Sequence, residues 1–269
     1  MCILAHPDDE SLATGGILAK YAAEGVATYL VCATRGERGW HGDPASYPGP
    51  AALGHIREAE LRAAAKMLRL REVHLLGYSD GELDQAPAPE VIGALVSHLR
   101  RVRPQVVVTF DPLGYYGHPD HIAISQHTTA ALVAAAAPDH PSTLPPHSVA
   151  KLYYIAASEQ AVAAYQAALG DLVMRVDGVE RRAAGWRSWA LTTSVDTSAY
   201  WRRVWSAVAC HRTQLPGYDA LRQLPPAHHR ALWGTQTFYR AMSLVNGGRD
   251  LEEDLFCGLP EPAQMRSAA

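Results

Sequence analysis

Two short runs of the sequence concentrate side chains that can bind a metal ion or move a proton. The first, AHPDDE, spans residues 5–10, and the second, GHPDH, spans residues 117–121. Each contains histidine, a turn-forming proline and carboxylate. Imidazole nitrogens and carboxylate oxygens are the ligands expected of catalytic zinc, which uses three protein ligands and keeps one position open for water. The two runs therefore predict a metal site with a hydrolytic function.

The spacing within each run fits metal ligation, although it also fits a simple turn. His6 and Asp9 are three residues apart across a proline-stiffened turn, and His118 and His121 repeat that spacing. A single His-Pro-Asp run is more often a turn whose aspartate accepts a backbone hydrogen bond. Two such runs, each with a second candidate ligand, favour a joint metal site. Zinc in an open site brings the pKa of a bound water down to around 7, so hydroxide is available near neutral pH.

Both runs follow predicted strands. Apolar, β-branched runs predict strands at residues 2–5, 27–34, 72–76 and 105–110. Helical periodicity predicts helices at residues 12–24, 52–70, 90–101 and 121–136. This alternation is typical of an α/β protein with a Rossmann-like, three-layer αβα fold and a mostly parallel central sheet. In such sheets ligands bind beyond the carboxyl ends of the strands, where the strand order reverses, and both runs fall there.

The second half of the chain is predicted to complete the same domain. A Pro-, Ser- and His-rich stretch at 138–147 predicts a loop that separates the core sheet, at about 1–137, from additional strands and helices at 148–259. One α/β domain over residues 1–269 is expected at this length. The polar tail beyond Leu259 is expected to fray. The further predicted elements are a strand at 151–156, a helix ending near 168 and a helix at 197–213.

Charge and composition exclude several classes of partner. The formal net charge of −3 gives no broad basic field, so we expect neither nucleic acid nor an anionic membrane as the partner. No stretch approaches the ~18 apolar residues that span a bilayer. The four cysteines are scattered without a CxxC pair, which is typical of a reducing compartment. We expect a cytoplasmic protein that acts on a small molecule, and association into a homo-oligomer is left open.

The AHPDDE and GHPDH runs, in this order and at about this separation, resemble the motifs of the LmbE-like, or PIG-L, family of N-acetylglucosamine deacetylases. The resemblance covers the first half of the chain well and the second half loosely. It implies a zinc-dependent enzyme that removes the acetyl group from an N-acetylated amino-sugar conjugate and releases acetate and a free amine. Fe²⁺ is an alternative to Zn²⁺, because the nitrogen and oxygen ligands suit both ions.

The resemblance also implies a division of roles between neighbouring residues. It assigns His6, Asp9 and His121 as the metal ligands. Asp8, whose side chain points the other way from that of Asp9, becomes the general base that takes a proton from the attacking water. Asp8 then returns the proton to the leaving amine as a general acid.

Three residues of the second motif are implied to act on the oxyanion. The resemblance makes His118 the stabiliser of the tetrahedral oxyanion, with Asp120 as its supporting partner, and it places Tyr116 near the developing charge. Removal of one such hydrogen-bond donor typically raises the activation free energy by about 2.7–4 kcal/mol. An alternative for Asp120 is the N-cap of the helix that follows, a position that Asp fills readily.

Substrate-binding residues are less sharply indicated. Arg57 begins a run similar to the Arg-x-x-Glu-Leu helix of the family, and Asp80 follows the third strand, where the family often carries a sugar-binding acid. Trp40, in a long Gly-rich loop, is expected to stack on a sugar ring or to anchor its loop. Arg57 alternatively forms an exposed helix pair with Glu60. The segment 211–214 also matches the family weakly, and its alternative is an ordinary helix C-terminus.

Two other functions compete with this one. An amidase that cleaves a larger amide, as in the thiol-conjugate amidases that resemble the same family, would use the same metal site. A metal-binding module without turnover would not need Asp8 beside the ligands. A nucleotide-binding sheet is disfavoured, because Thr14-Gly15-Gly16 is neither a Walker loop nor a GxGxxG fingerprint.

Overall fold

The computed structural model describes residues 1–171, 173–176, 178–248 and 250–260. Within them, the strands are β1 (Cys2–Leu4), β2 (Tyr29–Thr34), β3 (Glu72–Tyr78), β4 (Val106–Phe110), β5 (Lys151–Ile155), β6 (Val173–Val176), β7 (Val179–Arg182), β8 (Thr193–Asp196) and β9 (Thr235–Ser243). The α-helices are α1 (Asp9–Leu12), α2 (Gly15–Ala23), α3 (Pro50–Leu68), α4 (Ala88–Val102), α5 (Gly114–Gly117), α6 (Pro119–Ala136), α7 (Glu159–Leu169), α8 (Trp201–Val208), α9 (Asp219–Gln223) and α10 (Pro226–Trp233). Short 3₁₀ turns are η1 (Pro44–Ser46), η2 (Leu83–Gln85), η3 (Ser188–Ala190) and η4 (Leu215–Tyr218).

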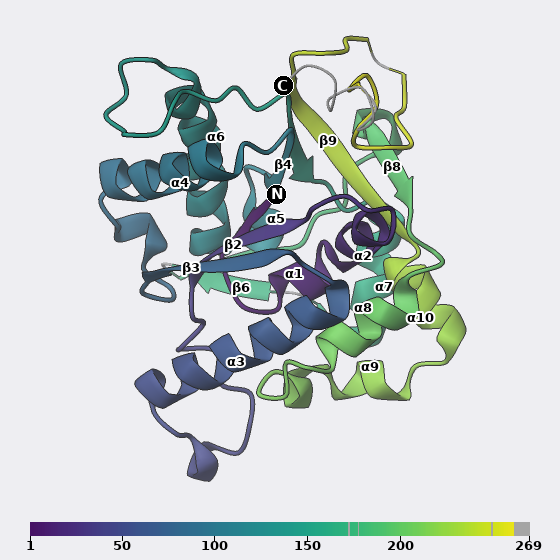
Figure 1. Ribbon diagram of the computed structural model, residues 1–269. Helices are drawn as coiled ribbons and strands as arrows, with labels where there is room; N and C mark the ends of the chain where they lie inside the picture. The colour runs from purple at the N-terminus through teal and green to yellow at the C-terminus, as the bar shows by residue number, and fades with distance from the viewer. Residues whose placement is uncertain (172, 177, 249, 261–269) are drawn as a thin grey trace.

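The described strands form one seven-stranded sheet in the order β3-β2-β1-β4-β5-β9-β8 and a separate hairpin, β6-β7. Strands β1 to β5 run parallel, whereas β9 is antiparallel to both β5 and β8 (Figure 1). From β1 the chain builds outward through β2 to β3, then returns to the other side of β1 for β4 and β5. The strand order therefore reverses between β1 and β4, the place where such sheets bind ligands.

Helices cover both faces of this sheet. Helices α4 and α6 pack together on one face, and α2, α3 and α8 pack together on the other. All residues of β1 and β4 are buried, because these central strands are covered on both faces. This burial explains why the two strands appear in the sequence as continuous apolar runs. The predicted three-layer α/β fold with a mostly parallel sheet is confirmed.

The predicted elements of the first half are confirmed, with one correction. The helix expected at 12–24 is α2, which begins only at Gly15, and a separate short helix, α1, precedes it, because the chain bends at Ala13 and Thr14 between them. Helix α2 then begins with two glycines at a close crossing. A Cβ atom added at Gly16 would lie 2.7 Å from the hydroxyl oxygen of Thr197, so a larger residue does not fit without a shift.

The second half departs further from the prediction. The strand at 151–156 is confirmed as β5, and the helix ending near 168 is α7. The helix expected at 197–213 is shorter, since α8 ends at Val208 and the chain then turns. Strands β6 to β9 and helices α9 and α10 were not predicted. The tail expected to fray lies, from residue 261 onward, outside the described residues.

No α-helix in the described ranges is long and apolar enough to cross a membrane. The cysteines differ in setting: Cys2 and Cys32 are buried in the core, whereas Cys257 is exposed.

Candidate active site

The AHPDDE run forms a tight turn after β1 that separates its two aspartates. The carboxylate of Asp9 accepts hydrogen bonds from the backbone N–H groups of Ala5 (3.2 Å) and His6 (2.7 Å). Asp8 has a φ of 117°, a left-handed backbone conformation that costs energy in a residue with a side chain. Both aspartates line the same cavity. The strained turn therefore places two carboxylates at one site.

Three nitrogen and oxygen donors converge at the switch point. The Nδ1 atom of His6 lies 3.1 Å from the Nε2 atom of His121. The Oδ2 atom of Asp9 lies 3.7 Å from the same atom of His6, and the Oδ1 atom of Asp9 lies 3.5 Å from that of His121. Tetrahedral ligands held ~2.0–2.2 Å from zinc lie roughly 3.3–3.6 Å from one another. The three side chains predicted as ligands, which we call the donor cluster, are therefore together, at separations close to this range.

Two carboxylates fix the ring of His6 in the orientation that ligation needs. The Nε2 atom of His6 lies 3.0 Å from Asp120 and 3.1 Å from Asp80. A proton on Nε2 that is shared with these carboxylates leaves the Nδ1 lone pair free for a metal, as metal-binding histidines usually require. Burial alone would lower the pKa of His6, but these hydrogen bonds and the charge of Asp9 raise it to about 10, so a metal that binds Nδ1 must displace a proton from it. The same negative field favours a divalent cation.

Burial shifts the pKa values of the other two members of the donor cluster, Asp9 and His121. Burial raises the pKa of Asp9 to about 7, although the charge of His6 opposes the change. Burial, with the nearby charge of His6, holds the pKa of His121 well below its usual value, so this imidazole is neutral. The ring of His121 stacks on Phe110 at the end of β4, with centroids 3.8 Å apart. A neutral, fixed imidazole is the form that binds a metal.

Other groups of side chains at this site also lie close enough to share an ion. One replaces Asp9 by His118 and comprises His6, His118 and His121; the other comprises His6, Asp80 and Asp120. In the second group, the Asp120 carboxylate accepts the backbone N–H groups of Gly81 (2.7 Å) and Leu83 (3.0 Å), just as the Asp9 carboxylate accepts two backbone N–H groups.

The expected roles of Asp120 require correction. Asp120 does not cap α6: the N-cap is His118, whose Nδ1 atom accepts the backbone N–H of Asp120 at 3.1 Å. The carboxylate of Asp120 instead faces His6, so the histidine that it orients belongs to the first motif. Hydrogen bonds from His6 and two backbone N–H groups lower its pKa, against the effect of burial.

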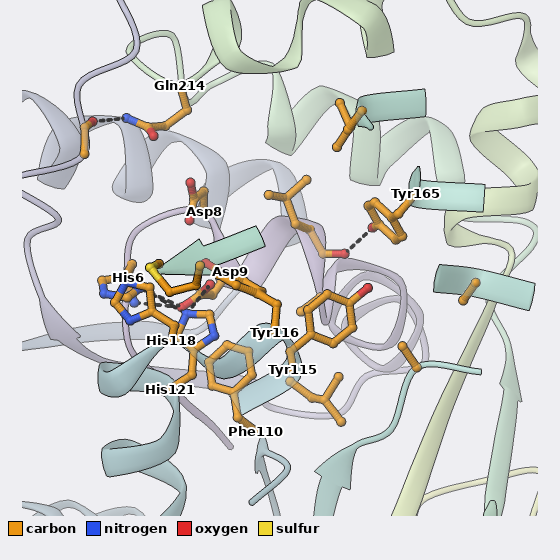
Figure 2. Close-up of a pocket in the computed structure, with 18 of the residues that line it drawn as sticks. His6, Asp8, Asp9, Phe110, Tyr115, Tyr116, His118, His121, Tyr165 and Gln214 are labelled. Carbon is orange, nitrogen blue, oxygen red and sulfur yellow. Dashed lines mark hydrogen bonds and ion pairs between the residues drawn. The ribbon is translucent and has the colours of Figure 1, made fainter. Parts of the chain in front are cut away.

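His118 and Tyr116 lie beside the donor cluster and line the cavity (Figure 2). Burial and the charge of His6 lower the pKa of His118 to about 4, so its ring is neutral. Because Nδ1 accepts from the backbone, the neutral ring carries its proton on Nε2 and is a donor there. The Tyr116 ring stands nearly perpendicular to that of His118, and burial raises the pKa of its phenol. Both side chains are therefore protonated donors at neutral pH.

Arg57 contacts the turn after β1 directly. Its guanidinium is buried, lies 3.2 Å from the Asp8 carboxylate and donates to the backbone carbonyls of Pro7 and Gly36. The expected exposed pair with Glu60 is absent among the described contacts of Arg57. Arg57 thus holds Asp8 in place as well as lining the cavity.

The structure separates the two remaining candidates for substrate binding. Asp80 lines the cavity, and its carboxylate accepts the backbone N–H of Arg38 at 2.9 Å. Trp40 does not line the cavity. Its indole N–H donates to the backbone carbonyl of Asp43 at 3.1 Å, and its ring packs near Tyr47, which matches the alternative of a loop anchor.

A buried acid-histidine pair is the main site feature that the sequence did not assign. Glu10 and His211 are both fully buried, and the Nε2 atom of His211 lies 2.8 Å from the Glu10 carboxylate. The other oxygen of Glu10 accepts the backbone N–H of Asp8 at 2.9 Å. Coulombic attraction and the hydrogen bond raise the pKa of His211 and lower that of Glu10, against the effect of burial on both. The pair is thus linked to the strained conformation of Asp8.

The residues after His211 hold neighbouring elements in place. Thr213 donates its backbone N–H and its hydroxyl to Glu60 on α3, at 2.9 and 2.7 Å. Gln214 donates to the carbonyl of Gly39, in the loop after β2, at 2.8 Å. The weak match at 211–214 was therefore the available signal for this support of the site.

Fold and site together define a Rossmann-like α/β protein with a group of His and Asp side chains, able to hold a metal ion, at the switch point of its sheet. The family model described as PIG-L: GlcNAc-PI de-N-acetylase matches residues 1–132. A 1D-myo-inositol 2-acetamido-2-deoxy-alpha-D-glucopyranoside deacetylase from Thermobifida fusca is 36% identical over 239 residues, covering 80% of this chain and 82% of that protein. The chain belongs to the PIG-L family of de-N-acetylases, and the resemblance seen in the sequence is confirmed.

Solved structures agree on the fold. The conserved protein TT1542 from Thermus thermophilus superposes with a TM-score of 0.65 at 28% identity, covering 91% of this chain and 96% of that chain. An N,N'-diacetylchitobiose deacetylase from Pyrococcus horikoshii also gives a TM-score of 0.65, at 22% identity, covering 89% and 83%. At that identity the second likeness establishes the fold alone.

Proposed function

We propose that this chain is a zinc-dependent deacetylase that removes the acetyl group from an N-acetylglucosamine conjugate, as the name of the Thermobifida relative states for that protein. The observation that carries the proposal is the convergence of His6, Asp9 and His121, at 3.1 to 3.7 Å from one another, beside a second carboxylate at Asp8. A metal site that only stabilised the fold would not need the strained turn that presents Asp8.

His6, Asp9 and His121 are the proposed ligands, and they leave room for solvent because all three lie on the wall of an open cavity. A divalent ion held there polarises the amide carbonyl and acidifies water. Zinc suits the two imidazoles and one carboxylate, and Fe²⁺ suits them as well. The set with His118 in place of Asp9 is the competing assignment, and metal analysis of variants distinguishes them.

Asp8 is the proposed general base and acid. Its carboxylate removes a proton from the attacking water and then delivers that proton to the amine as the C–N bond breaks. General acid-base groups of this kind contribute typically 10²–10⁴-fold to the rate. Arg57 holds the carboxylate from one side, and Glu10 holds the backbone from the other.

His118 and Tyr116 are the proposed donors to the oxyanion. Both are protonated at neutral pH, so each presents a hydrogen-bond donor where the carbonyl oxygen gains negative charge. Asp120 contributes indirectly, because it orients His6 through its carboxylate and offers its backbone N–H to His118. A donor that is fixed before the reaction stabilises the transition state without further reorganisation.

Polar residues on one side of the donor cluster are suited to sugar hydroxyls. The cavity has a volume of about 530 Å³, within the usual range for small-molecule sites. Asp80 and Arg57 remain candidates for contact with the sugar, alongside their roles in the site. The polar lining residues on this side include Arg38, Gly39, His41, Gly81 and Gln214.

A panel of N-acetylglucosaminides tests the proposal. The zinc-loaded protein should release acetate and free amine in equal amounts from at least one conjugate, and removal of the metal by a chelator should abolish the release. Acetate release that persists without metal would contradict the proposed mechanism. We also propose that residues 1–269 act as one domain, since β5, β8 and β9 of the second half join the same sheet as β1.

A further inference from the structure

The cavity follows the edge of the sheet and changes character along it. Its polar residues come from the loops after β2 and β3, which include Arg38 and Asp80. The donor cluster lies after β1 and β4. Beyond β4 the lining comes from the end of β5 and the start of β9, where Ile155 and Thr235 lie. Because the strand order is β3-β2-β1-β4-β5-β9, the cavity has two arms on opposite sides of the donor cluster.

The arm beyond β4, which we call the apolar arm, is lined largely by carbon. Tyr115 and Tyr165 lie on its side of the cavity, apart from Gln214 and His6 (Figure 2). Residues Val173 and Met174 of β6 also line it. The apolar arm comprises Leu12, Tyr115, Ile155, Ala161, Tyr165, Leu169 and Leu232, these two residues of β6, and Gln236 and Thr237 on its walls.

The polar side chains of Tyr165, Gln236 and Thr237 on the walls of the apolar arm already have protein partners, whereas the Tyr115 hydroxyl has none among the described residues. The Tyr165 hydroxyl donates to the carbonyl of Leu12 at 2.8 Å and accepts the indole N–H of Trp233 at 2.9 Å. The Gln236 amide accepts from Ile17 and donates to Ala13. The Thr237 hydroxyl donates to Ala156.

Because most of these wall groups are already hydrogen-bonded to protein, the apolar arm suits an apolar part of a substrate better than a polyhydroxylated part. A sugar or inositol placed there would lose its hydrogen bonds to water and gain few in return, which is costly for buried hydroxyls. An alkyl chain has no such loss and gains from leaving water.

We propose that the apolar arm binds the acyl group of the amide, so that this chain hydrolyses N-acyl amino sugars whose acyl chain is apolar and longer than acetyl. This inference rests on the proposed function. A trans amide directs its nitrogen substituent and its acyl carbon chain to opposite sides of the C–N bond. With the carbonyl at the donor cluster, a sugar in the polar arm directs the acyl chain into the apolar arm.

The reaction remains a hydrolysis. The oxygen of water bonds to the acyl carbon, the C–N bond breaks, and the amine leaves with the proton that Asp8 returns. The products are a fatty carboxylate and a free amino sugar. Each methylene that leaves water raises the binding constant roughly fourfold, so a longer acyl chain should raise kcat/KM.

The test is a series of glucosaminides with one fixed aglycone and N-acetyl, N-butanoyl or N-hexanoyl groups, assayed by amine release from the zinc-loaded protein. We expect kcat/KM at least about tenfold higher for hexanoyl than for acetyl. This is less than full transfer of the additional methylenes out of water would give. A value that falls or stays level with chain length would overturn the inference while leaving deacetylation intact. Absence of turnover across the whole series would instead remove the proposed function.

A pair of variants on α7 locates the acyl chain. Ala161 lines the apolar arm, whereas Ala163 is exposed on the same helix. Ala161→Phe should lower the hexanoyl-to-acetyl ratio of kcat/KM at least about fivefold, because the ring fills space that more than one methylene would occupy. Ala163→Phe should leave the ratio unchanged. Equal ratios in the two variants would contradict the location.

A second series, with N-acetyl fixed and alkyl aglycones of increasing length, separates the two ends of the substrate. We expect kcat/KM to change little with the aglycone. A steep rise with aglycone length, abolished by Ala161→Phe, would show that the apolar arm holds the aglycone and would overturn the inference.

Discussion

The Nδ1 atom of His6 lies 3.1 Å from the Nε2 atom of His121, although 115 positions separate the two residues in the chain. One follows β1 and the other lies in the first turn of α6, which begins shortly after β4. The two strands are neighbours at the switch point, so the fold brings the two histidines together. With Asp9 beside them, they form the cluster on which the proposed chemistry depends.

Arg57 should affect turnover more than substrate binding. Arg57→Met removes one partner of the buried Asp8 carboxylate, and we expect kcat to fall at least about tenfold with KM within about twofold, since the proposed general base loses a contact that positions it. Steady-state kinetics with a thermal melt measures this. A rise in KM at unchanged kcat would identify Arg57 as a sugar ligand instead.

His118 should act without binding the metal. His118→Ala removes one donor to the oxyanion, and we expect kcat to fall by about 10²–10³ while the zinc content stays near one per chain. Zinc analysis of the purified variant is the check. If that variant is purified without zinc, then the set of His6, His118 and His121 is the correct one.

His211 should support Asp8 from a distance. His211→Ala leaves Glu10 buried without its imidazole partner, which should disturb the backbone of Asp8 and lower kcat by at least about tenfold, since removing one partner of a buried pair is costly. Rescue of part of the rate by His211→Gln would support a hydrogen-bonding role. His228→Ala, at an exposed histidine of the same half, is the matched control.

Glu252 should make folding stability depend on acid pH. Its carboxylate accepts hydrogen bonds from Lys151 (2.7 Å), Tyr153 (2.6 Å) and Arg240 (2.6 Å). Burial opposes its ionisation, but these bonds and one from Asn246 lower its pKa to about 2. The unfolded value is about 4.3, so this contribution is present above that pH and is lost as the pH falls towards 2.

Glu252→Gln should therefore destabilise the fold at pH 7 by about 3–5 kcal/mol, because it leaves buried cations unpaired. The variant should also lose less stability than the parent between pH 5 and 2. Urea unfolding across this range measures both effects. Parallel pH profiles for the two proteins would show that Glu252 does not carry the dependence.

The sequence was sufficient to predict the first half of the fold and the edge of the sheet at which the two polar motifs meet. Strands β1 and β4 are buried on both faces, so they stand out as apolar runs, and the polar motifs follow them closely, the second after a short loop. Local pattern therefore located His6, Asp9 and His121 at one edge of the sheet.

The support of the site could not be predicted in the same way. His211 meets Glu10 across 201 positions of the chain, and neither residue has a local pattern that names its partner. The predicted partner of the Asp120 carboxylate was wrong for a related reason. The match to family motifs placed this carboxylate beside His118, whereas packing turns it towards His6. Strand β9 pairs antiparallel between β5 and β8, and such long-range pairing leaves little trace in the sequence around it.

Zinc content and turnover of Asp8→Ala and His121→Ala, measured on the same preparations, test the division between ligands and base most directly. Asp8→Ala should retain about one zinc per chain and lose roughly 10²–10⁴ in kcat. His121→Ala should lose both the zinc and the activity. A zinc-free Asp8→Ala protein, or a His121→Ala protein that keeps its zinc, would contradict the account.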